Sequence, residues 1–138
     1  MDVEVSLLRL YLLRGMYLLI ALGEGSRVWP IILHHSSPWE FSYGVSISLL
    51  GALTLLALVG VRYPVKMLPL LAYEFTWKLI WLLAAWLPLL LTHHLDTRTA
   101  NNAFAMFMGV VLVPLVVPWR YLWRNYVACA GDRWLRSQ

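Results

Sequence analysis

Four long apolar runs alternate with short polar segments along this chain. A helix that crosses a membrane needs about 20 mostly apolar residues, because each residue advances about 1.5 Å through a hydrocarbon core about 30 Å thick. The pattern predicts an all-α, four-helix transmembrane bundle that forms one domain, residues 1–138. The predicted spans cover residues 10–33, 44–61, 67–92 and 103–119, and a basic tail covers 120–138.

The first apolar run allows two interpretations, because Glu24 and Arg27 interrupt it. In one, a single long helix carries residues 15–33 through the bilayer, and both charges lie at mid-depth. In the other, the span covers 6–22 and both charges lie in a loop. We favour the long helix, and the loop stays open as the alternative.

Composition supports the bilayer as the solvent of this chain. Hydrophobic residues make up 61% and charged residues 13%, and the mean hydropathy is +0.68. Soluble domains carry about a quarter charged residues, so too few polar side chains are present to coat a water-facing surface. The single cysteine, Cys129, excludes an internal disulfide and a multi-cysteine metal site.

The placement of the basic residues predicts the orientation. Most of them flank the apolar runs on one side, and Arg98 lies on the other. Because positive residues are retained in the cytoplasm, both termini and the 61–66 loop are predicted to be cytoplasmic, in a bacterial inner membrane. This topology accounts for the net charge of +4, so we expect contact with the lipid bilayer and no nucleic-acid partner. The residues on the basic side are Arg9, Arg14, Arg62, Lys66, Arg120, Arg124, Arg133 and Arg136.

Ionisable residues inside the runs are the main candidates for function. Glu74 and Lys78 lie one helical turn apart in the third run, where each charge costs roughly 2.5–3.5 kcal/mol at the bilayer centre. If Glu24 and Arg27 lie at similar depth, Glu24 could pair with Lys78 and Glu74 with Arg27. Such a network would either lock the bundle or serve as a relay or polar-solute site. An aromatic stripe runs beside it, made of Tyr73, Trp77 and Trp81.

Histidine pairs close the first and third runs on the predicted outer side. They are His34, His35, His93 and His94, with Glu40 and Asp96 nearby in the sequence. Imidazole and carboxylate together are a plausible environment for Zn or Cu. Wetted interfacial histidines are the simpler interpretation, and no cofactor is otherwise expected.

A weak internal similarity relates the two halves of the chain. At one constant offset, Pro30, Gly51 and Arg62-Tyr63 recur as Pro88, Gly109 and Arg120-Tyr121. Such an offset is compatible with two parallel helical-hairpin repeats. The alternative is that membrane hairpins share similar flanking residues.

One stretch carries a family resemblance. It runs from Arg62 to Leu71 and continues through Glu74, Trp77 and Lys78 to Trp81-Leu82; Trp29-Pro30, Leu33-His34-His35 and Pro118-Trp119-Arg120-Tyr121 accompany it. It resembles uncharacterised small four-helix inner-membrane proteins of bacteria, and the chain is similar to DoxX-type proteins in architecture only. The resemblance implies a four-helix fold, and it brings no assigned activity and no functional residues.

Three functions follow as hypotheses. The first is a non-enzymatic accessory or scaffold subunit that forms a homo-oligomer or binds a larger membrane protein. The second is a homo-oligomeric, ion- or proton-coupled transporter or channel for small solutes that uses the charged residues. The third is a metal-binding or redox accessory that uses the four histidines.

Overall fold

The computed structural model describes residues 5–133, and helices are the only regular elements in this range. Residues 134–138 of the predicted basic tail lie outside the described residues. The long elements are α1 Leu7–His34, α2 Phe41–Arg62, α3 Leu68–Trp81 and α5 Thr97–Val116. The short elements are a π-helical turn Leu82–Trp86, α4 Leu87–Leu91, α6 Trp119–Leu122 and a second π-helical turn Trp123–Val127.

The number of spans agrees with the prediction. In the described part of the chain, four helical segments are long and apolar enough to cross a membrane. They are Leu7–His34, Phe41–Arg62, Leu68–Leu91 and Thr97–Val116. The first is one continuous helix through Glu24 and Arg27, which contradicts the loop interpretation of these residues.

The third span is a composite of α3, a π-helical turn and α4. Pro88 explains the change of helix type, because a proline has no N–H to donate and its ring crowds the carbonyl one turn earlier. The turn Leu82–Trp86 precedes it, and the Leu87 N–H donates to the Leu82 carbonyl five residues back. A π-helical turn widens the backbone at this point, so the span passes Pro88 and continues to Leu91.

The fourth span ends earlier than predicted. Helix α5 stops at Val116, and Val117 adopts an extended backbone with ψ of 128°. A residue before proline is disfavoured in the helical conformation, and here Pro118 follows. The predicted end at residue 119 is therefore wrong, and the chain turns into α6 instead of continuing through the same span.

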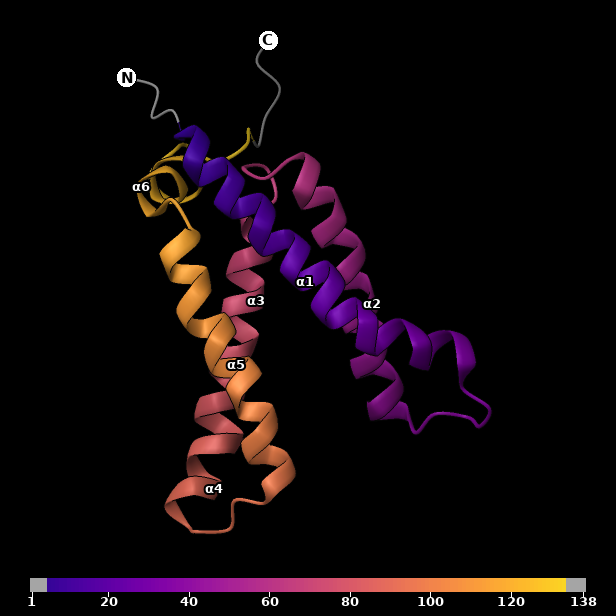
Figure 1. Ribbon diagram of the computed structural model, residues 1–138. Coiled ribbons are helices and arrows are strands. Elements are labelled where there is room, and N and C mark those ends of the chain that lie inside the picture. The colour runs from indigo at the N-terminus through magenta and orange to yellow at the C-terminus, as the bar shows by residue number, and fades with distance from the viewer. Residues whose placement is uncertain (1–4, 134–138) are drawn as a thin grey trace.

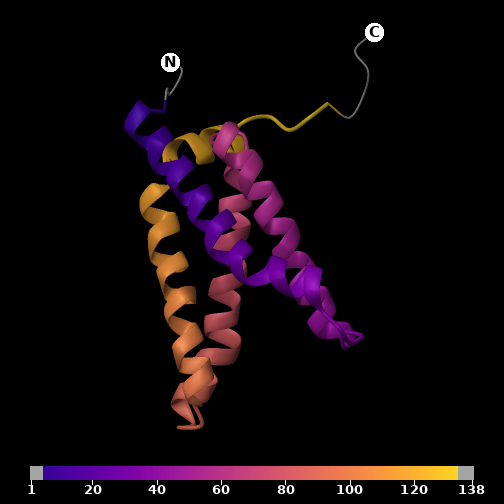
Figure 2. The same ribbon diagram turned by 45° about the vertical axis from the view of Figure 1, so that its right-hand side comes forward.

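The four spans form two helical hairpins (Figures 1 and 2). Helix α1 packs along α2, and α3 with the π-helical turn Leu82–Trp86 packs along α5. The start of α1, the α2–α3 turn and the end of α5 lie together at one end of the molecule, which we call the joined end. Both views show the hairpins diverging from there towards their loops, residues 35–40 and 92–96.

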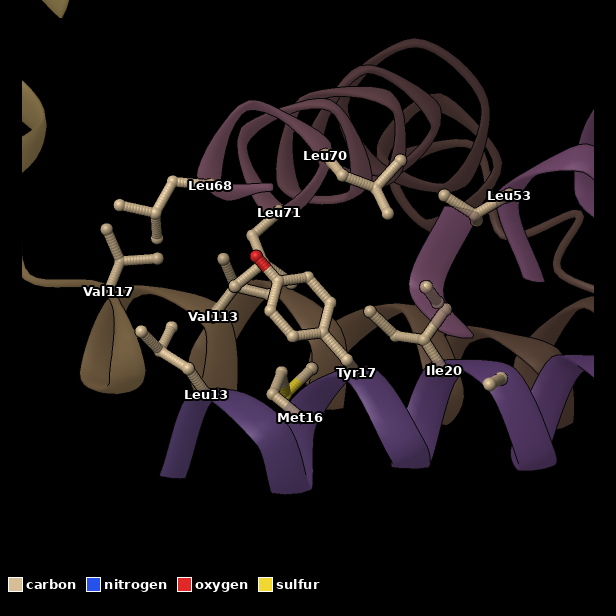
Figure 3. Close-up of a cluster of buried hydrophobic side chains, with 12 residues drawn as sticks. Leu13, Met16, Tyr17, Ile20, Leu53, Leu68, Leu70, Leu71, Val113 and Val117 are labelled. Carbon is tan, nitrogen blue, oxygen red and sulfur yellow. The ribbon is translucent and has the colours of Figure 1, made fainter. Parts of the chain in front are cut away.

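The hydrophobic core lies at the joined end and is centred on Tyr17 of α1 (Figure 3). The Tyr17 ring is fully buried, and its hydroxyl donates to the Pro64 carbonyl at 2.9 Å. Gly60 of α2 makes room for the ring, because a Cβ at this position would lie 2.5 Å from the Tyr17 Cδ1. The other core members come from all four spans and from the residue after α5: Leu13, Met16, Ile20, Ala21, Leu53, Ala57, Leu68, Leu70, Leu71, Val113 and Val117.

Two arginines of α1 bind the carbonyl ends of other helices at the joined end. The Arg9 guanidinium donates to the Val117 carbonyl at 3.0 Å, and the Arg14 Nε donates to the Val61 carbonyl at 3.2 Å. The last carbonyls of a helix lack intrahelical partners and carry partial negative charge, so a cation is favoured there. These bonds tie α1 to the ends of α5 and α2.

The contact between Gly60 and Tyr17 gives a direct test of this packing. We expect Gly60→Ala to destabilise the protein by about 1–3 kcal/mol, because the added methyl group overlaps a buried ring that cannot move freely. Unfolding of the purified protein in mixed micelles of mild detergent and dodecyl sulfate measures the change.

Gly15→Ala is the matched control. Gly15 lies on α1, and no neighbouring atom lies within 4 Å of the position that an added methyl group would take. Alanine should therefore be neutral there, or up to about 1 kcal/mol stabilising through its higher helix propensity. Equal effects of the two substitutions would contradict the packing described here.

Candidate functional site

A cavity between α1, α3 and α5 brings the four predicted intramembrane charges together. Its volume is about 120 Å³, and its lining includes Glu24 and Arg27 from α1 and Glu74 and Lys78 from α3. The remaining lining is apolar or glycine and comes from α1 and α5: Met16, Leu19, Ile20, Gly23, Ala105, Met108, Gly109 and Leu112. The site thus lies between the two hairpins.

The Glu74 carboxylate is partnered by residues of its own helix. Lys78, one turn further along α3, forms an ion pair with Glu74 Oε1, and the Trp77 indole N–H donates to Glu74 Oε2 at 2.7 Å. The Lys78 ammonium also lies 5.6 Å from the centre of the Trp77 ring, within cation–π range. Glu74 is fully buried and Lys78 is 6% exposed, so this pair is neutralised inside the protein.

Gly109 of α5 makes room for the Lys78 side chain. A Cβ on Gly109 would lie 2.8 Å from both the Cδ and the Nζ of Lys78. The Lys78 side chain therefore lies across the backbone of α5, which a larger residue would prevent. Nothing in the sequence marked Gly109 as a site residue, since its only signal was its correspondence with Gly51 in the proposed repeat.

Glu24 and Arg27 line the same cavity, but they do not form the predicted pairs. Lys78 pairs with Glu74 instead, so the expected Glu24–Lys78 and Glu74–Arg27 pairs are absent from the described residues. The physical reason is local: the i, i+4 spacing on one helix already brings Glu74 and Lys78 into contact. Glu24 is half-buried and Arg27 is exposed, and both face a hollow rather than another charge.

Two residues of the predicted aromatic stripe lie towards α2. Tyr73 and Trp77 line a second hollow of about 260 Å³ between α3 and α2, with Ser46, Leu49, Leu50 and Leu53 on the other wall. Tyr73 is half-exposed, and Trp81 is partly buried further along the helix. Trp77 belongs to both features, since it lines the apolar hollow and hydrogen-bonds the buried carboxylate.

The four histidines are not gathered into one site. Within residues 5–133, no group of three or more histidine, cysteine, aspartate or glutamate side chains is placed to hold a metal ion. His34 and His35 lie at the end of α1, and His93 and His94 follow α4, at the tips of two diverging hairpins (Figure 1). Among residues 5–133 the four histidines therefore do not form the predicted cluster.

The loop histidines and carboxylates have structural partners. The His35 ring packs on Trp39, with ring centres 4.3 Å apart. His93 adopts a left-handed backbone with φ of 56° and terminates α4 through bonds from the N–H groups of His93 and His94 to the Leu90 and Leu89 carbonyls. This is the Schellman arrangement that usually takes glycine.

Glu40 and Asp96 are helix N-caps rather than metal ligands. Glu40 accepts hydrogen bonds from the N–H groups of Ser42 and Tyr43, each at 3.0 Å, and these bonds lower the pKa of its carboxyl. Asp96 caps α5, where hydrogen bonds from the Thr99 side chain and from its N–H lower the pKa of Asp96. In both cases, hydrogen bonds from the start of the helix favour the ionised form of the carboxyl group.

No protein-family model, curated protein or solved structure matches this chain. The resemblance to small four-helix inner-membrane proteins of bacteria therefore stays a prediction.

The ion pair in α3 predicts a specific pattern of stability. Lys78→Met should destabilise the protein by about 3–5 kcal/mol, because it leaves a carboxylate buried without its cation. The double variant Glu74→Met/Lys78→Met should recover most of that loss, since both charges are then replaced by apolar groups of similar length. Free energies of unfolding in mixed micelles measure both changes.

Thr76→Ala is a control on the same helix, because Thr76 is exposed and bonds only the Ala72 carbonyl of its own helix. Its effect should be within about 0.5 kcal/mol. A double variant as unstable as the single one would show that the pair itself, and not the removal of one partner, stabilises the fold.

Proposed function

We propose that this chain is a non-enzymatic, multi-pass membrane protein that works as a subunit of a larger assembly, in the first place with further copies of itself. The observation that carries the proposal is the limited contact between the two hairpins. Their shared core is confined to the joined end, and the loop-side half of each hairpin is a helix pair without a third helix beside it (Figures 1 and 2).

The second hairpin supports this proposal most clearly. Only 17% of the most apolar stretch is buried in the Leu68–Leu91 span and in the Thr97–Val116 span, against 33% in each of the first two spans. Large side chains remain exposed along α5, among them Phe104, Val111 and Leu115. Helices associate in lipid through close packing, and the little-buried faces of the second hairpin are the surface on which a neighbouring helix would pack.

We further propose that the joined end faces the cytoplasm and that the protein resides in a bacterial inner membrane. Six basic residues, Arg9, Arg14, Arg62, Lys66, Arg120 and Arg124, belong to this end or to the turns beside it, whereas Arg98 lies at the loop end of α5. The positive-inside rule then places both loops, residues 35–40 and 92–96, outside. In this orientation the two hairpins enter the membrane from the same side, as parallel repeats would.

Co-purification of two tagged copies tests the assembly. Copies with different affinity tags, expressed in the same cells and solubilised in mild detergent, should be recovered together through either tag. Copies expressed separately and mixed after solubilisation are the control for association in the detergent. A purified protein that contains one copy and no stoichiometric partner, measured by native mass spectrometry, would contradict the proposal.

Chemical labelling of the single cysteine tests the proposed orientation. Cys129 is exposed and follows α6 and the π-helical turn Trp123–Val127, so a membrane-impermeant maleimide should label it only after the cells are permeabilised. A Cys129→Ser/Ser37→Cys variant moves the thiol to the exposed 35–40 loop and should react in intact spheroplasts. The reverse pattern of labelling would show that the joined end lies outside.

A further inference from the structure

Two of the four charged residues in the cavity remain available for a ligand. Glu74 and Lys78 neutralise each other, and the second carboxylate oxygen of Glu74 is bonded to Trp77. Glu24 and Arg27, in contrast, form no ion pair or side-chain hydrogen bond with the described residues. Ionisable groups within membrane spans almost always have partners. The unpartnered Glu24 and Arg27 in the cavity wall therefore indicate that a ligand partners them.

The positions of Glu24 and Arg27 define the charges that such a partner carries. They lie three residues apart on α1, so their backbones are separated by about 4.5 Å along the helix axis. Both line the same cavity, and they present opposite charges to it. A group that satisfies both must therefore offer an anionic part and a cationic part a few atoms apart.

We propose that the cavity between the hairpins binds a small zwitterion, with its anionic oxygens at the Arg27 guanidinium and its ammonium group at the Glu24 carboxylate. A guanidinium presents parallel N–H donors that match a carboxylate or phosphate, and an ammonium group donates to a carboxylate. The opposite wall does not favour either sign, because the Glu74–Lys78 pair is neutral as a whole. This site is independent of the assembly proposed above.

The volume of the cavity limits the size of the ligand. A cavity of about 150 Å³ holds benzene, which has six heavy atoms. At about 120 Å³, this cavity has room for a molecule of about five heavy atoms, such as glycine. A phosphoethanolamine group is larger and would extend towards the exposed Arg27 side. The same chemistry can therefore come from a free amino acid or from a zwitterionic lipid headgroup.

The test measures thermal unfolding of the full chain by tryptophan fluorescence, in a detergent without zwitterionic groups. Glycine and O-phosphoethanolamine are the probes, and acetate and methylamine at equal ionic strength are the analogues with one charge. At least one zwitterion should raise the unfolding temperature in a saturable way, at concentrations where neither analogue does. Nanodiscs of phosphatidylglycerol with and without phosphatidylethanolamine form the lipid arm of the test.

Gly23→Leu is the decisive variant. Gly23 lines the cavity, and no atom lies within 4 Å of the Cβ that it lacks, so a leucine fills the cavity without a clash at its first carbon. It should weaken zwitterion binding at least tenfold. Gly15→Leu, at the other open glycine of α1 and outside the cavity lining, is the matched control and should bind as the parent does.

Charge variants separate the two ends of the ligand. Glu24→Gln and Arg27→Gln should each weaken binding at least tenfold, and Arg98→Gln, at the loop end of α5, should not. A saturable effect of phosphatidylethanolamine but not of glycine, lost in Gly23→Leu, assigns the site to a lipid headgroup, and the opposite pattern assigns it to a free amino acid.

Three results would overturn the proposal. They are no saturable effect of either zwitterion or of phosphatidylethanolamine, equal effects of the single-charge analogues, and binding that persists in both Gly23→Leu and Glu24→Gln/Arg27→Gln. The assembly proposed above is measured by co-purification, so it stands or falls separately from this result.

Discussion

The contact of Tyr17 with the α2–α3 connection is the interaction on which the rest of the structure depends. The ring lies against Gly60 near the end of α2, and its hydroxyl bonds the carbonyl of Pro64 in the turn that leads into α3. Helix α1 is thereby fixed at the point where the chain passes from one hairpin to the other. In a bilayer, where apolar burial alone gives little drive for helices to associate, such close packing and a buried hydrogen bond are the available sources of stability.

Small residues repeat this principle at the other close contacts. A Cβ on Gly51 of α2 would lie 2.9 Å from Ile32 of α1, and one on Gly109 of α5 would lie 2.8 Å from Lys78 of α3. In each hairpin, then, a glycine of the returning helix receives a long side chain of the first helix. The second case differs in chemistry, because the side chain received is charged and belongs to the buried Glu74–Lys78 ion pair.

The packing at the joined end also positions the charged side chains. The Arg9 and Arg14 guanidinium groups donate to the carbonyl ends of α5 and α2, so two residues of the basic cluster tie the helices together. The cavity begins where the core stops and the hairpins diverge, with Glu74 and Lys78 on one wall and Glu24 and Arg27 on another.

Much of the fold was readable from the sequence, because membrane spans impose strong local patterns. Run length and hydropathy predicted four helical spans, and the i, i+4 spacing placed Glu74 and Lys78 one turn apart on the third of them. These features depend on residues within one turn of each other or on the average polarity of a segment. The orientation, the assembly and the repeat stay predictions.

Tertiary structure decided what depends on distances between helices. Hydropathy does not fix the angle between two hairpins, so the sequence did not show that Glu24 and Arg27 face a cavity instead of pairing with Glu74 and Lys78. It did not show that the two loops that carry the histidines diverge from each other. The packing of Tyr17 on Gly60 and of Lys78 on Gly109 sets the distances between the helices. The sequence around a glycine does not show which side chain will pack against it.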